Sequence, residues 1–284
     1  MTTTTEQASG ASGDQEGRRR LPDLKALLRS SAGIAVAMAV MNVATYAFQM
    51  ISARLLGPTE YGAVASLMAL LMVVAVLQLG LQATGARRIS AEPEHVGQIE
   101  RMVLRVTYRA ALGLGLLMMA LAPVVHHVLR LDSVVPALFL AVSAVPLTIM
   151  GGQAGVLQGE RRWFSLAGIY LAMGLGRVVV GTACIVVSPT ESAAMLGVMI
   201  AMFAPALVGW LALRRPGLHV RDGDRHSDQH TARRVVTETG SASLALLAFF
   251  VLSNLDIVVA RNVLDDHDAG LYAAGLILTK AVLF

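Results

Sequence analysis

The sequence predicts an all-α, polytopic transmembrane helix bundle, and two charge-free stretches are the main reason. Neither the segment between Glu60 and Arg87 nor that between Asp132 and Glu160 contains an Asp, Glu, Lys or Arg. A helix needs roughly 20 apolar residues to cross about 30 Å of hydrocarbon, and both segments are longer than that. Composition agrees, because the 284-residue chain is 55% hydrophobic and 15% charged, with a mean hydropathy of +0.63. Since open strand edges cannot be satisfied in lipid, these segments must be helices.

Seven apolar stretches are long enough to span a membrane, and an eighth begins near Ala269. The seven predicted spans cover residues 31–53, 62–86, 106–128, 134–157, 164–187, 193–213 and 240–260. The residues before them divide in two. The polar residues 1–20 predict a disordered tail, and 21–29 a short amphipathic helix on the membrane surface. We therefore treat 1–29 as one cytoplasmic segment.

Basic residues predict how the spans are oriented. With the N-terminus inside, 18 Lys and Arg side chains fall on inner segments and only Arg54, Arg130 and Arg261 on outer ones. Such an asymmetry is the positive-inside pattern of a cell (inner) membrane protein with a cytoplasmic N-terminus. The basic excess is therefore explained by topology, and we expect no nucleic-acid partner.

A short repeat predicts two parallel lobes. Residues 53–62, at the end of the first span, share an Ala-Arg pair, a Leu, an acidic turn and a closing Gly with residues 260–270. Six spans separate the two copies, so both lie on the same side of the membrane, as in transporters built from parallel repeats. We expect a six-helix lobe at 30–213, a cytoplasmic inter-lobe linker at 214–239 and the first two helices of a second lobe at 240–284. The second lobe is incomplete, so we expect a fragment that does not transport alone.

Four motifs resemble those of a known family. The hairpin ARLLGPTEYG at 53–62 resembles the first outer loop of bacterial O-antigen-flippase-like polysaccharide exporters, which belong to the multidrug/oligosaccharidyl-lipid/polysaccharide (MOP) exporter superfamily. LQGERRWF at 157–164 resembles their loop between spans four and five. Asn-Leu-Asp at 254–256 and Ala-Gly-Leu-Tyr at 269–272 resemble the start of their second lobe.

The resemblance implies a flippase that moves a lipid-linked saccharide, carried on an isoprenoid diphosphate, across the cytoplasmic membrane by alternating access. Three alternatives remain open. They are a drug or metabolite antiporter of the same superfamily, a membrane-embedded polymerase or ligase of envelope polysaccharides, and an inactive fragment. Because the outer connections are short and no catalytic motif occurs, we expect a protein that is not an enzyme and that needs no cofactor.

Four residues are candidates for substrate binding. Arg177 interrupts the fifth span near the bilayer midplane, where a guanidinium is expensive and should face water or an anion. It could clamp a diphosphate, or it could pair structurally with Asp256. Asp256 and Lys280, in the seventh and eighth spans, could line an inter-lobe cavity, and Asp256 could take up a coupling cation or proton. Asn254 joins them from the Asn-Leu-Asp motif.

Two further patterns have structural explanations. Gly151, Gly155 and Gly159 recur every fourth residue on one face of the fourth span, which predicts close helix packing. His226 and His230 have a spacing that zinc could use. A solvated linker is the better interpretation, and we expect no metal site.

Overall fold

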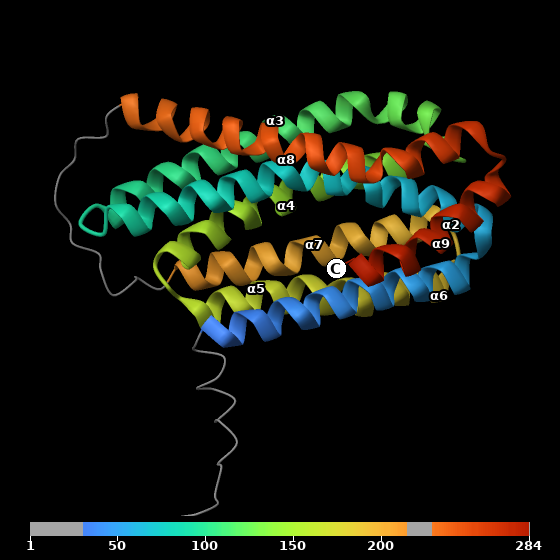
Figure 1. Ribbon diagram of the computed structural model, residues 1–284, viewed down its shortest axis with the longest axis horizontal. Helices are drawn as coiled ribbons and strands as arrows, with labels where there is room; N and C mark the ends of the chain where they lie inside the picture. The colour runs from blue at the N-terminus through green and yellow to red at the C-terminus, as the bar shows by residue number, and fades with distance from the viewer. Residues whose placement is uncertain (1–30, 215–228, 284) are drawn as a thin grey trace, which may run out of the picture.

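The computed structural model describes residues 31–214 and 229–283, and every element of regular structure in these ranges is a helix. The elements are α2 (Ser31–Ala91), α3 (Val96–Val128), α4 (Val135–Gly159), α5 (Trp163–Gly176), η1 (Arg177–Gly181), α6 (Thr182–Val187), α7 (Glu191–Leu213), α8 (Gln229–Val263) and α9 (Asp266–Leu283). Figure 1 shows them running along one common long axis. The predicted all-α bundle is therefore confirmed.

Helix α2 consists of two membrane-crossing limbs joined at a sharp kink. Gly57 lies at the bend with φ 75° and ψ 173°, a conformation that glycine adopts without a Cβ penalty. Pro58 follows and has no N–H to continue the helical ladder. The predicted spans 31–53 and 62–86 are the two limbs, which run in opposite directions on either side of the bend at the right of Figure 1.

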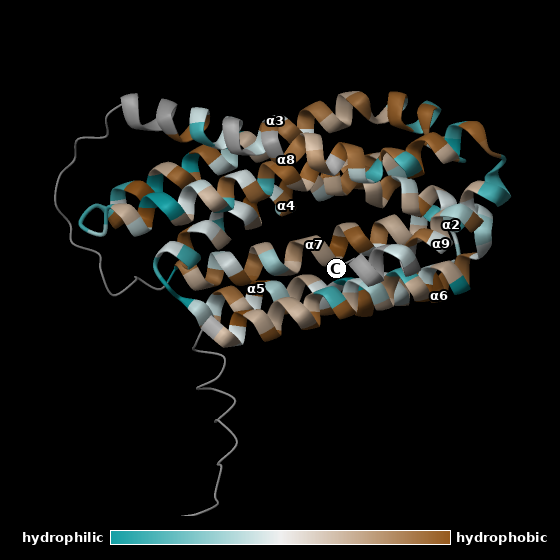
Figure 2. Ribbon diagram, in the orientation of Figure 1, coloured by the Kyte–Doolittle hydropathy of each residue, from teal (hydrophilic) through white to brown (hydrophobic). Residues whose placement is uncertain are grey.

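In the described part of the chain, six helices are long and apolar enough to cross a membrane. Because α2 counts once among them and holds two predicted spans, these six correspond to all seven of the predicted full-length spans, although the last begins at Leu246 and not at residue 240. The eighth predicted span lies in α9, which is not among the six. Figure 2 shows apolar residues along the middle of the bundle and hydrophilic residues at its two ends.

The structure differs from the predicted spans in two ways. The fifth span is continuous through α5 and α6 but contains the five-residue π-helical turn η1, which hydropathy cannot reveal. Helix α8 already begins at Gln229, so the predicted linker of 214–239 is helical over its last part. The amphipathic helix proposed for 21–29 and His226 lie outside the described residues. Within those residues, no group of three His, Cys, Asp or Glu side chains could hold a metal.

The glycines of α4 form a close seam with the second limb of α2. A Cβ at Gly151 would lie 2.6 Å from Gln78 Cγ, and one at Gly155 would lie 2.7 Å from the Gln82 carbonyl oxygen. A Cβ at Gly159 would lie 2.6 Å from the Cβ of Ile89. All three distances are too short for any side chain, so the predicted close packing is confirmed.

Helices α8 and α9 lie against α2, and the two hairpins of the predicted repeat contact each other. A Cβ at Gly62 would lie 3.0 Å from the Cα of Gly270, the residue that the repeat aligns with it. Both hairpins are therefore at the same end of the bundle, called here the Arg261 end (right in Figure 1). The opposite end, where α8 begins, is called the Glu238 end.

Candidate functional site

Arg177 begins the π-helical turn η1 in the middle of an apolar span. A π turn inserts one extra residue into a helix and recurs at functional sites. Glycines allow this turn to lie close to its neighbours. A Cβ at Gly181 would lie 2.5 Å from the Phe48 ring, and one at Gly197 would lie 2.6 Å from Gly181 Cα. The turn is therefore held tightly between the first limb of α2 and helix α7.

The Arg177 guanidinium is buried without a carboxylate. The residue is 8% exposed, and its Nη2 donates only to the Met202 sulfur at 3.9 Å, while Nε has no partner. A thioether is a weak acceptor. Among the side chains that the structure describes, no carboxylate lies within ion-pairing distance of Arg177, so the structural pairing with Asp256 that we considered does not form. The Asp256 carboxylate instead accepts from the backbone N–H of Ile257 at 2.9 Å.

A small cavity lies where α8 and α9 meet the two limbs of α2. Its volume is about 50 Å³, enough for water-sized molecules. Residues from all these helices line it: Phe48, Ser52, Tyr61, Met68, Asn254 and Ala273. Asn254 is 4% exposed and is the only one of the four predicted binding residues in this wall as the structure describes it.

Arg177, Asn254 and Asp256, the predicted binding residues whose side chains the structure describes, do not share one site. Asp256 is half-buried on α8 but does not contribute to the described cavity wall. Lys280 lies on α9, and its side chain is outside what the structure describes. The π turn that Arg177 begins adjoins the cavity through Phe48, which lines the cavity and packs against Gly181.

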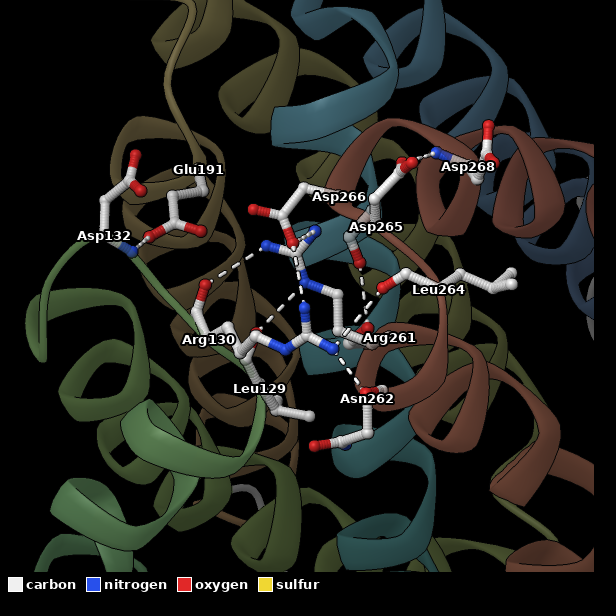
Figure 3. Close-up of polar contacts among 12 residues, drawn as sticks. Leu129, Arg130, Asp132, Glu191, Arg261, Asn262, Leu264, Asp265, Asp266 and Asp268 are labelled. Carbon is white, nitrogen blue, oxygen red and sulfur yellow. Dashed lines mark hydrogen bonds and ion pairs between the residues drawn. The ribbon is translucent and has the colours of Figure 1, made fainter.

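Arg261 is a buried polar residue that the sequence patterns did not single out as a site. It is 3% exposed at the end of α8, and it reaches the turn between α3 and α4 (Figure 3). In the sequence it counts as a basic residue of an outer connection and as one member of the repeat. The repeat is the one sequence pattern that could have pointed to Arg261, because Arg261 and Arg54 occupy equivalent positions in its two copies.

Comparison with known proteins places the chain in a family. Residues 27–283 match the family described as "Polysaccharide biosynthesis protein". The search of curated proteins gave no match.

Solved structures with a similar fold are named as transporters. One is the inward-facing conformation of a multidrug resistance MATE family transporter of the MOP superfamily, with 15% identity, a TM-score of 0.72 and coverage of 86% of this chain and 58% of that one. The outward-facing conformation of such a transporter gives 16% identity, a TM-score of 0.66 and coverages of 91% and 60%. A MOP superfamily transporter from Pyrococcus furiosus is described as having a binding pocket of reverse polarity. It gives 16% identity, a TM-score of 0.63 and coverage of 90% of this chain and 63% of that one. The chain thus spans about three fifths of the length of these structures, and at such identities the likeness shows the fold alone. The match over 27–283 establishes more: the chain belongs to the family described as polysaccharide biosynthesis protein.

Proposed function

We propose that this protein acts in the transport of a lipid-linked saccharide across the cell (inner) membrane by alternating access. The observation that carries the proposal is the buried guanidinium of Arg177, which has no carboxylate partner among the described side chains. Membership of a family named for polysaccharide biosynthesis supports a saccharide substrate. The shared fold of inward- and outward-facing MOP transporters supports transport.

The role proposed for Arg177 is to bind the diphosphate that links the saccharide to its isoprenoid lipid. A guanidinium presents paired N–H donors that match two phosphate oxygens, and the bond strengthens where water is excluded. Asn254 would donate to the saccharide or diphosphate from the cavity beside Phe48. Asp256 and Lys280 remain candidates for later steps, with Asp256 taking up a coupling cation or proton.

A drug or metabolite antiporter of the same superfamily is the second candidate, because similar solved structures are named as multidrug transporters. The charge of Arg177 distinguishes the two. A buried cation with no counter-ion among the described side chains attracts an anionic substrate and repels the lipophilic cations that many drugs are. An enzyme of envelope synthesis is the least supported, since none of these structures is named as an enzyme.

Binding by the 284-residue chain itself tests the proposal, because it does not require complete transport. The chain would be reconstituted in nanodiscs and titrated with farnesyl diphosphate, with farnesol and with the lipophilic cation tetraphenylphosphonium. We expect binding of farnesyl diphosphate only. Arg177→Ala should abolish it, and Arg177→Lys should weaken it by about tenfold or more, because a point charge loses one of the two paired hydrogen bonds.

Arg54→Ala is the matched control, since Arg54 is an exposed arginine on the first limb of α2. Equal loss of binding in Arg54→Ala and Arg177→Ala would contradict a specific site. Preferential binding of tetraphenylphosphonium would support the antiporter instead.

A further inference from the structure

Arg261 ties α8 to the turn between α3 and α4. Its Nε donates to the Leu129 carbonyl oxygen at 3.0 Å, and its Nη2 donates to that of Arg130 at 3.2 Å. Its Nη1 lies 3.2 Å from the Asp266 carboxylate at the start of α9. One buried guanidinium therefore connects the end of α8 and the start of α9 to the α3–α4 turn, which lies far away in the sequence (Figure 3).

Arg130 makes the reciprocal contacts from the other side. Its Nη2 donates to the carbonyl oxygens of Asn262 and Leu264, the latter at 3.4 Å, and its Nη1 lies 3.9 Å from Asp266. Arg130 also occupies the left-handed position that ends α3, with φ 47°, where the N–H of Leu131 bonds back to His126. Glycine is the usual residue at such a helix end. An arginine at this position strains the backbone, but its side chain is long enough to reach α8.

The turn that carries Arg130 is fixed to the first six-span unit. The backbone N–H of Asp132 donates to the Glu191 carboxylate at 3.1 Å, and the N–H of Glu191 donates to the Glu60 carboxylate at 2.6 Å. Helices α2 and α7 therefore hold one side of the contact. The other side, α8 and α9, is attached to it through Arg261, Arg130 and Asp266, which we call the Arg261 latch.

An apolar contact adjoins the latch and closes the same end. Gly62 and Gly270 touch backbone to backbone, and a Cβ at Gly270 would overlap the Pro58 carbonyl group. The cavity that contains Asn254 lies beside this contact, between the same helices. The latch and the glycine contact thus separate that cavity from the Arg261 end of the bundle.

We propose that the Arg261 latch and the Gly62–Gly270 contact form a gate, which opens when α8 and α9 swing away from the α3–α4 turn. The inference rests on the proposed alternating access. Chemistry favours a reversible contact, because most acceptors in the latch are main-chain carbonyls, and both arginines can exchange these for water when they separate. Opening would connect the cavity and its Asn254 wall to the solution at the Arg261 end.

Spin labels can measure the gate directly in the full chain. In a Cys184→Ser background, Val263→Cys on α8 and Val187→Cys on α6 would carry the labels, since both side chains are largely exposed at the Arg261 end. We expect Arg261→Ala to add a longer-distance population in nanodiscs. Gly270→Ala should do the same by steric separation with every charge in place, so the result does not depend on the folding of a single variant.

Matched variants serve as controls for each perturbation. Arg54→Ala removes the equivalent, exposed arginine of the repeat, and Gly275→Ala adds a methyl group to α9 where nothing lies within 4 Å. Neither should change the distance distribution. As a second readout, the thiol introduced by Ser52→Cys in the cavity wall should react with an impermeant maleimide about tenfold faster or more in Arg261→Ala, the effect of losing one charge-assisted hydrogen bond. It should also react faster in Gly270→Ala, where the added methyl group separates the helices.

Two results would overturn the gate: unchanged distances and labelling in both Arg261→Ala and Gly270→Ala, or equal changes in these variants and their controls. No substrate is present in either measurement. A chain whose gate responds but which binds no farnesyl diphosphate would therefore keep the gate and refute the substrate proposal.

Discussion

Arg177→Met should make the protein more stable and, in the same step, abolish diphosphate binding. An arginine at the centre of a membrane helix costs roughly 2.5–3.5 kcal/mol on insertion scales. The structure provides little to offset that cost, because the guanidinium contacts only a thioether at 3.9 Å and leaves Nε unpaired. Methionine is flexible, fills a similar space and packs well against Met202. We therefore expect the free energy of unfolding to rise by about 2 kcal/mol.

Reversible unfolding in mixed micelles, driven by added sodium dodecyl sulfate, measures this difference. Helix content by circular dichroism and the fluorescence of Trp163 and Trp210 would report the transition. Arg54→Met is the control, and because Arg54 is exposed its effect should stay within about 0.5 kcal/mol. If Arg177 instead has a structural partner, its loss should destabilise the chain by about 3–5 kcal/mol, as breaking a buried ion pair does. That outcome would refute the ligand-site argument.

Two other predictions concern packing and topology. Gly151→Ala should destabilise the bundle by about 1–3 kcal/mol, because its Cβ overlaps Gln78. Gly113→Ala is the control, because it has open space and should gain up to about 1 kcal/mol of helix propensity. Equal effects in the same unfolding assay would contradict the glycine seam. The positive-inside pattern predicts that an impermeant thiol reagent labels Asp132→Cys but not Arg225→Cys in intact cells, each in the Cys184→Ser background; the reverse pattern would invert the proposed orientation.

The sequence was sufficient for the helices and for their order. Charge-free length alone located the spans, and the four-residue glycine spacing identified the seam between α4 and α2. The hairpin repeat aligned Gly62 with Gly270, and these two residues touch. Each of these predictions depends on local composition or spacing, which a single sequence contains.

Contacts between distant segments could not be predicted in the same way. Arg54 and Arg261 look equivalent in the repeat, yet Arg54 is exposed and Arg261 is 3% exposed. The difference arises because only Arg261 faces the α3–α4 turn, more than a hundred residues away. The π turn at Arg177 is another example, since it depends on how closely Phe48 and Gly197 approach Gly181. The Arg177–Asp256 alternative could likewise be decided only by placing the two helices.

The two ends of α8 are held to α2 and its neighbours by different kinds of contact. At the Glu238 end, the Glu238 carboxylate accepts from Arg88 Nε and Nη2 at 3.0 and 3.1 Å and from Arg87 Nη2 at 2.8 Å. These groups are partly exposed, so salt screens them. At the Arg261 end, four of the acceptors for the two arginines are main-chain carbonyls, which carry no net charge and do not titrate, and the Asp266 carboxylate is the fifth.

Salt and acid should therefore act mainly on the Glu238 end, because the acceptors described there are carboxylate oxygens, whereas among the acceptors of the Arg261 latch only Asp266 is a carboxylate. The hydrogen bond from Arg88, followed by the charges of Arg88 and Arg87, lowers the pKa of Glu238 below its usual 4.5. A lowered carboxyl pKa contributes stability that is complete above pH 4.5 and is lost as the pH falls through the folded-state value.

Spin labels at Ala91→Cys and Val236→Cys should separate at low pH or in about 1 M salt, where the Debye length falls to about 3 Å. The pair at the Arg261 end should move less, because only the ion pairs to Asp266 weaken there. In Glu238→Gln the Glu238-end labels should already be apart at neutral pH and should no longer respond to acid. Equal responses at the two ends would show that α8 moves as one rigid body and would contradict the difference between the two contacts.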